Sequence, residues 1–347
     1  MDSIFYIGSE DGVTTARSSD GHVWDITAHG LDKWDIPGLA VAPGHPNKVF
    51  AGTRGDGVWM SDDFGESWAK PCYGKRGPGK VRCVTIDPHD PRRIYAGTEP
   101  IDIFVSEDEG NSWDRLDAVW NIPYVATVTY PVSTVEPHVR NIVVDPTDAS
   151  TLYAALQVGF IVKSTDGGLS WRLLDKNLDC DVHTIAIDPA NAQRLLVATG
   201  GHDARKGTAP GRALYSSEDA GESWAPIATN FTKEYSVPLA FDAIDPGIVY
   251  SAVANGQPGR WRRRDTGAES TFIRSVDGGR TWDGIDGGIA AKDFPEVIIA
   301  DSATPGLIYT GCRSGDFYAS ENSGETWTPM GISLGVKDLG SVVLTHT

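Results

Sequence analysis

Cysteine is scarce in this 347-residue chain, and its four cysteines lie far apart. Cys72, Cys83, Cys180 and Cys312 form no Cys-x-x-Cys pair, so their spacing does not predict a zinc knuckle. Scattered thiols of this kind are typical of a reducing compartment. We therefore expect reduced cysteines and a cytoplasmic protein.

The chain also lacks a surplus of basic residues. Lys and Arg number 30 against 47 Asp and Glu, which gives a net charge of −17. This charge repels polyanions, so we expect neither a nucleic-acid nor a membrane partner. No apolar run approaches the ~20 residues of a membrane helix. The first residues, MDSIFYIGSEDG, have no basic start and no long apolar core, so we expect no secretory signal.

What the chain repeats is an eight-residue phrase, Ser-x-Asp-x-Gly-x-Ser/Thr-Trp, which we call the box. It stands at residues 61–68, 106–113, 164–171, 217–224 and 275–282, with Asn322 in the Asp position at 320–327 and in shortened form at 18–24. The Ser and Asp oxygens suit the backbone N–H groups of a tight turn, and Gly permits a positive φ. Catalytic or calcium-binding aspartates are the alternative. Near-copies in such number are more typical of a structural turn.

A second phrase precedes each box: an apolar strand, a polar turn that usually contains Asp-Pro, and another apolar strand. The clearest copies are 81–98, 139–156 and 182–199, with looser ones starting near Leu39, Leu239 and Val297. Together with the box, each unit predicts four antiparallel strands over about 45 residues, which is one propeller blade.

The spacing of the box tryptophans counts the blades. From Trp24 onward the intervals are 44, 45, 58, 53, 58 and 45 residues. Seven boxes predict an all-β, seven-bladed β-propeller that forms a single domain over residues 1–347. The first blade lacks a first strand, and residues 341–345 look like a lone first strand. We expect this C-terminal strand to join the N-terminal blade and close the ring, which a solenoid would not require.

The boxes resemble the Asp-box, or BNR, repeats of sialidase-like and sortilin-like β-propellers. Xyloglucanases and the photosystem II assembly factor are similar too. The resemblance covers essentially the whole chain and implies the propeller fold, but these relatives include hydrolases, receptors and assembly factors. The Arg-Ile-Pro phrase of sialidases does not occur in this chain. Sialidase activity is therefore not expected.

The strand order places the box turns on one face and the loops that exceed the repeat on the opposite face. These loops are 117–137, 200–212 and 254–270, and the last two each carry a local charge of +2. Basic loops in an acidic chain indicate an anionic ligand or partner, although solvated surface loops would look the same. Trp34, Trp120 and Trp261 also fall on this face, either as an aromatic platform or as loop anchors.

Aligned strands predict a polar funnel at the centre of the same face. Arg82, Arg140, His183 and Glu296 stand at equivalent starts of first strands, and Arg54, Glu99, Gln157 and Arg313 stand at the ends of second strands. Charge there is not needed for packing between blades. The funnel is either a binding site or a water-filled channel with no activity.

Three histidines, His138, His183 and His202, map to this face in neighbouring blades. Three converging imidazoles could hold zinc, copper or manganese with an open position for substrate. One imidazole alone could act as a general base, and each could equally be an ordinary surface histidine.

Three functions follow from these patterns. The first is a hydrolase or lyase that acts on an anionic, carbohydrate-like substrate, with His183, Glu296 and Glu99 catalytic and Tyr124 or Tyr130 assisting. Its substrate-binding residues would be Arg54, Arg82, Arg140, Arg313, Trp120, Trp261 and Arg262. The second is a binding or assembly propeller whose basic loops dock an acidic segment of a partner protein. The third is a metal-dependent enzyme built on His138, His183 and His202.

Overall fold

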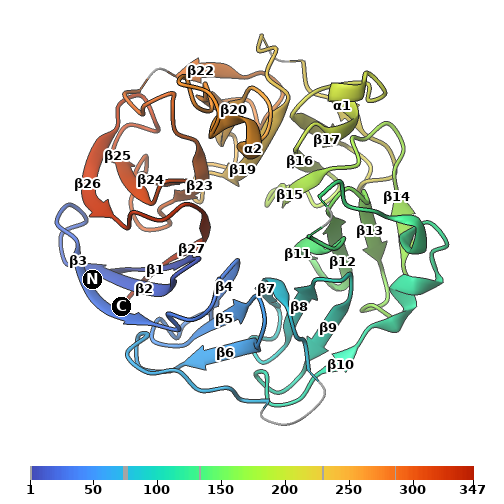
Figure 1. Cartoon of the computed structure of the whole chain (residues 1–347), viewed down its shortest axis with the longest axis horizontal. Helices are drawn as coiled ribbons and strands as arrows, with labels where there is room; N and C mark the ends of the chain where they lie inside the picture. The colour runs from blue at the N-terminus through green and yellow to red at the C-terminus, as the bar shows by residue number, and fades with distance from the viewer. Residues whose placement is uncertain (1, 73–76, 133, 229, 286) are drawn as a thin grey trace. The chain divides into compact units, whose positions relative to one another are not determined.

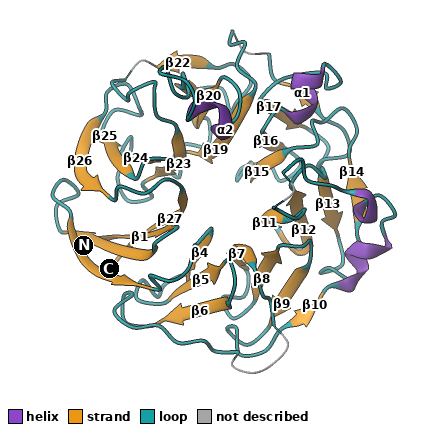
Figure 2. Ribbon diagram, in the orientation of Figure 1, coloured by secondary structure: helices purple, strands orange, loops and turns teal. Residues whose placement is uncertain are grey.

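The structure is a computed structural model that describes residues 2–72, 77–132, 134–228, 230–285 and 287–347. It divides into two compact units, one of residues up to Leu173 together with Asp338–Thr347 and one of Leu174–Lys337. The described residues form seven antiparallel sheets, six with four strands and one with three, and Figure 2 shows strands and loops in nearly all of the chain. The fold class is a seven-bladed β-propeller, as the sequence predicts. The single-domain boundary stays a prediction.

The first unit holds four sheets, which Figure 1 colours from blue to green in chain order apart from the C-terminal strand. They comprise β27 (Leu339–His346), β1 (Ser3–Ser9), β2 (Gly12–Ser18) and β3 (Asp25–Gly30); β4 (Gly38–Val41), β5 (Val49–Thr53) and β6 (Gly57–Ser61); β7 (Val81–Ile86), β8 (Ile94–Thr98), β9 (Ile103–Ser106) and β10 (Asp114–Arg115); and β11 (Val139–Asp145), β12 (Asp148–Leu156), β13 (Ile161–Ser164) and β14 (Arg172–Leu174). Two 3₁₀ helices, η1 (Asp117–Asn121) and η2 (Val125–Thr127), lie between β10 and β11.

The second unit holds three sheets and two short helices. The sheets comprise β15 (Val182–Ile187), β16 (Leu195–Thr199), β17 (Leu214–Ser217) and β18 (Ala225–Pro226); β19 (Tyr235–Phe241), β20 (Val249–Ala254), β21 (Thr271–Ser275) and β22 (Asp283–Ile285); and β23 (Pro295–Ala300), β24 (Ile308–Cys312), β25 (Asp316–Ser320) and β26 (Thr328–Ser333). Helix α1 (His202–Lys206) precedes β17, and helix α2 (Pro258–Trp261) precedes β21.

The second strand is fully buried in six of the seven sheets that the described residues form. All residues of β8 in the first unit and of β20 in the second are buried. Both strands are short apolar runs bounded by turns, the pattern expected of a strand covered on both faces. The core of each unit therefore lies between stacked sheets.

Each box forms the turn that its sequence predicts. In the copy at 106–113, Ser106 Oγ accepts the Gly110 N–H (2.8 Å), and Asp108 Oδ1 accepts the Ser112 N–H (2.8 Å) while Oδ2 accepts the Ser112 hydroxyl (2.7 Å). Gly110 has a φ of +85°, which favours glycine. Trp113 packs with Phe50 in a core cluster shared with the preceding sheet. Because the turn's own donors occupy the carboxylate, the box is built for structure.

The two ends of the chain meet in one sheet. Strand β27 pairs with β1 in antiparallel register from Ser3 opposite His346 to Ser9 opposite Leu339. The predicted joining of the C-terminal strand to the N-terminal blade is therefore present, and its role in closing a ring stays a prediction. In the part of the chain that the structure describes, no helix is long and apolar enough to cross a membrane.

Candidate functional site

The residues that the aligned strands single out stand where strand pairing is interrupted. The pairing register of the first two strands of a sheet shifts at Arg82 in β7, Arg140 in β11, His183 in β15 and Glu296 in β23. Such a bulge inserts an unpaired residue and changes the direction of its side chain. The same irregularity therefore presents a polar side chain in four sheets.

In the first unit, two arginines converge on one buried glutamate. Glu99 follows β8, and its side chain is only 3% exposed. Its Oε2 atom lies 3.3 Å from Arg54 Nη2 and 3.3 Å from Arg82 Nη1. Arg54 also contacts Asp35, with 3.4 Å between Nη1 and Oδ2. A buried carboxylate held by two guanidinium groups is a strong, oriented ion pair.

His138 completes this group from the residue before β11. Its Nε2 lies 3.0 Å from Arg82 Nη2, and its Nδ1 lies 2.9 Å from the Glu136 carbonyl oxygen. Arginine can only donate, so Nε2 accepts and Nδ1–H donates. Burial, and then the charge of Arg82, lower the pKa of His138 to about 2. The imidazole is therefore neutral at physiological pH.

A third arginine makes the group electropositive. Arg140 Nη1 donates to Gln157 Oε1 (3.2 Å). Burial, and then the charges of Arg54 and Arg140, lower the pKa of Arg82 to about 10, while Glu99 and Asp35 oppose this change. We call Arg54, Arg82 and Arg140 the arginine cluster. At Arg82 the charges of Arg54 and Arg140 act more strongly than those of Glu99 and Asp35, so the local field there favours an added anion.

In the second unit, the predicted catalytic residues also have partners. Glu296 is 7% exposed, and its Oε2 lies 2.9 Å from Arg313 Nη1. His183 is 3% exposed, with Nδ1 2.8 Å from the Ser236 carbonyl oxygen and Nε2 3.5 Å from Asp181 Oδ1. Glu99 and Glu296, the predicted carboxylate pair, lie in different units, and each is paired with arginine.

The predicted loop tryptophans differ from one another. Trp120 in η1 is 38% exposed, and its Nε1 donates to Asp102 Oδ1 (2.9 Å). Trp261 in α2 is buried and packs against Tyr235 and Phe294, with ring centroids 5.1 and 5.0 Å apart. Trp261 thus anchors its loop and offers no open platform, whereas Arg262 beside it is exposed.

The three histidines predicted to hold a metal are divided between the units. His138 belongs to the first unit, and both of its ring nitrogens are engaged. His183 and His202 belong to the second unit. His202 Nδ1 lies near Cys180 Sγ and Asp203 Oδ1, a group that the sequence patterns did not predict because Cys180 belongs to no recognisable motif. The three-histidine site stays a prediction.

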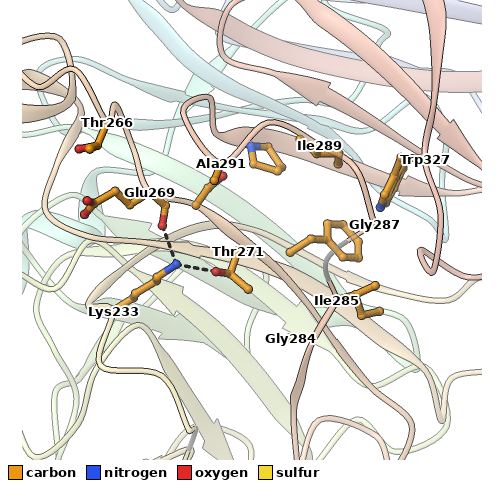
Figure 3. Close-up of a pocket in the computed structure, with 13 residues that line it drawn as sticks. Lys233, Thr266, Glu269, Thr271, Gly284, Ile285, Gly287, Ile289, Ala291 and Trp327 are labelled. Carbon is orange, nitrogen blue, oxygen red and sulfur yellow. Dashed lines mark hydrogen bonds between the residues drawn. The ribbon is translucent and has the colours of Figure 1, made fainter.

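A cavity in the second unit was also not predicted (Figure 3). It has a volume of about 670 Å³ and lies between the sheet of β19 to β22 and the sheet of β23 to β26. Lys233 Nζ donates to the Glu269 carbonyl oxygen and to Thr271 Oγ1, and Figure 3 shows the apolar Ile289 and Trp327 farther from this lysine. Burial lowers the pKa of Lys233. A single lysine outside any repeat gives no sequence signal.

Comparison with known proteins supports the fold of this chain but assigns no activity to it. No family model matches the chain, and no curated protein does. Among solved structures, a GH74 enzyme from Niastella koreensis is 17% identical with a TM-score of 0.61, over 86% of this chain and 45% of that enzyme. YCF48 bound to D1 peptide is 16% identical with a TM-score of 0.58, over 90% of this chain and 88% of YCF48. A candidate 6-phosphogluconolactonase from Bacteroides fragilis is 9% identical with a TM-score of 0.63, over 99% and 98% of the two chains.

These three solved structures share the propeller fold of this chain. At these identities the likeness does not extend to function. The chain spans less than half the length of the GH74 enzyme, and the neighbours include both enzymes and a peptide-bound protein.

Proposed function

We propose that the chain is a binding propeller whose arginine cluster holds the carboxylates of an acidic peptide segment. The observation that supports this most is that the charges of Arg54 and Arg140 act on Arg82 more strongly than those of Glu99 and Asp35. Guanidinium forks bind carboxylates through paired N–H donors, which favours a planar anion. Arg54 is about one-third exposed on its side chain, so a ligand can reach the cluster.

Acid–base catalysis is less well supported by the same contacts. A general acid or base must reach the proton that it transfers to or from the substrate. Glu99 and Glu296 are instead each buried and paired with arginine side chains. His138 is held neutral by burial and Arg82, with both ring nitrogens occupied. The contacts of Glu99, Glu296 and His138 therefore suit side chains that hold the arginines in position.

One of the neighbouring folds is described with a bound peptide. YCF48, a protein of matching length, is described in complex with D1 peptide, and the present chain covers 88% of it. The GH74 enzyme is more than twice as long as the part that aligns. A hydrolase or lyase acting on an anionic carbohydrate, and a metal-dependent enzyme using His138, His183 and His202, are the alternative functions.

Charge-neutral variants of the cluster test the proposal. We expect Arg54→Gln and Arg140→Gln each to weaken binding of a fluorescent hexaglutamate peptide by roughly 10- to 100-fold, since a hydrogen bond to a charged group contributes about 1.5–3 kcal/mol. Arg82 stays in place, so Glu99 keeps a partner. Fluorescence anisotropy at low and high salt measures the affinity, which should fall as salt rises.

The matched control is Arg274→Gln in β21, an arginine of the second unit whose side chain contacts Ser323 and Glu325. Equal affinities for this control and for the cluster variants would refute the proposal. Turnover of uronic-acid-containing oligosaccharides that is lost in Glu99→Gln or Glu296→Gln would favour the enzyme instead.

A further inference from the structure

Three metal-ligand atoms of different chemistry converge at the start of α1 in the second unit. Cys180 Sγ lies 3.3 Å from His202 Nδ1, and Asp203 Oδ1 lies 3.2 Å from the same nitrogen. One donor atom from each residue lies within 4.8 Å of the others. Two of the residues stand in the loop 200–212, which exceeds the repeat, and Cys180 precedes β15 in the same sheet.

The contacts do not match a catalytic triad. In a nucleophile–base–acid relay, the nucleophile and the acid use opposite nitrogens of the imidazole. Here the thiol and the carboxylate both face Nδ1. The three groups therefore meet at one nitrogen and do not form a relay.

A shared metal ion accounts for this convergence of three ligand atoms. Donor atoms about 2.0–2.3 Å from a tetrahedral zinc ion lie roughly 3.5 Å from one another. The distances of 3.3 and 3.2 Å around Nδ1 are therefore close to those around a shared ion. We propose that Cys180, His202 and Asp203 bind a zinc-type divalent ion through Sγ, Nδ1 and a carboxylate oxygen, with a fourth position left for water or an external ligand.

Neighbouring carboxylates favour a cation at this position. Asp203 Oδ2 accepts the Cys180 N–H, and the buried Asp179 and Asp181 flank this cysteine in the chain. These carboxylates favour an added positive charge, and a bound ion would itself deprotonate the thiol. Thiolate, imidazole and carboxylate together suit zinc better than magnesium or calcium.

Hydrogen bonds from backbone N–H groups to Asp179 and Asp203 hold these ligands in place. Asp179 is fully buried, and its Oδ2 accepts the N–H groups of Asp203 (3.0 Å) and Ala204 (2.9 Å) at the start of α1. The Cys180 N–H donates to Asp203 Oδ2 (3.1 Å). Asp179 is thus a positioning residue. The side chains of His202 and Asp203 are 18% and 21% exposed, which leaves a route for the ion.

Cobalt titration tests the site without knowledge of the protein's activity. Reduced, chelator-treated full-length protein is titrated with Co²⁺, and the thiolate-to-cobalt charge-transfer band and the stoichiometry are recorded. We expect one ion per chain, release by excess Zn²⁺, and loss of the band in Cys180→Ser. His202→Gln should weaken binding by at least about tenfold, since even the loss of an outer-shell partner commonly costs 10- to 100-fold.

Cys312→Ser and His45→Gln are the matched controls, a buried cysteine and an exposed histidine away from the site. They should keep the band and the affinity. If Cys180→Ser does not fold, the partly exposed His202 carries the test. Absence of a band in the unmodified protein, or a band of equal strength in His202→Gln, would overturn the proposal. Because the arginine cluster lies in the other unit, peptide binding and cobalt binding can fail independently.

Discussion

At the scale of the residue, His138 shows how burial and a neighbouring charge decide chemistry. The ring is 1% exposed, accepts from Arg82 and donates to the Glu136 carbonyl. Protonation would place a cation against the Arg82 guanidinium with no water to screen it. The imidazole therefore serves as a neutral hydrogen-bond link that orients Arg82.

This link predicts a pH dependence of stability. The pKa of His138 is about 2 in the folded chain and about 6.5 when unfolded, so below pH 6.5 only the unfolded chain takes up the proton. The folded state then loses about 1.4 kcal/mol per pH unit, or about 2 kcal/mol between pH 7 and 5. Urea unfolding at both pH values should show that His138→Gln removes this loss, while His45→Gln keeps it. An unchanged pH dependence in His138→Gln would contradict the assignment.

At the scale of the element, the box works as a turn because one side chain accepts several donors. Asp277 accepts from the Ser275 hydroxyl and from the Thr281 N–H and hydroxyl. In the copy with asparagine, Asn322 Oδ1 accepts the Ser320 hydroxyl and the Thr326 N–H, while Nδ2 donates to Thr326 Oγ1 (2.9 Å). The Thr326 hydroxyl therefore accepts a hydrogen bond at the position where the Thr281 hydroxyl donates one, and the turn keeps its bonded residues.

The chain thus contains its own control for a substitution in the box. We expect Asp277→Ala to lower the free energy of unfolding by about 1–2 kcal/mol, since its hydrogen bonds are lost and water replaces them only in part. Asp277→Asn should cost less than about 0.5 kcal/mol, because its amide can bond as that of Asn322 does. Urea unfolding midpoints measure both. If the Asn and Ala variants are equally unstable, the carboxylate itself matters and the turn interpretation is wrong.

The repeat determines how far the sequence predicts the site. Arg82, Arg140, His183 and Glu296 could be found by alignment because each stands at the same register shift in its sheet. Three of them contact the residue that follows the second strand of the same sheet: Arg82 contacts Glu99, Arg140 contacts Gln157 and Glu296 contacts Arg313.

Residues in loops outside the repeat cannot be aligned from one blade to the next, so their contacts are not predicted in this way. The burial of Trp261 against Tyr235 depends on the path of α2, and the approach of Cys180 to His202 depends on α1. Both paths are set by tertiary packing, so local sequence does not reveal them. Lys233 likewise becomes notable only through its contacts with Glu269 and Thr271.

At the scale of the whole molecule, net charge and local charge have opposite signs. The chain carries −17, yet three arginines gather in the first unit, and two loops of the second unit are locally basic. An acidic ligand must overcome general repulsion, so its binding would be local and sensitive to salt. Both the arginine cluster and the basic loops are candidates for that contact, and we assign it to the cluster.

Hydrogen–deuterium exchange with and without hexaglutamate tests this assignment most directly. We expect slower exchange on peptide binding in segments that contain Arg54, Arg82, Glu99 and residues 136–140, and no such change in the Arg54→Gln/Arg140→Gln double variant. Protection confined to the loops 200–212 and 254–270, or protection that persists in the double variant, would contradict it.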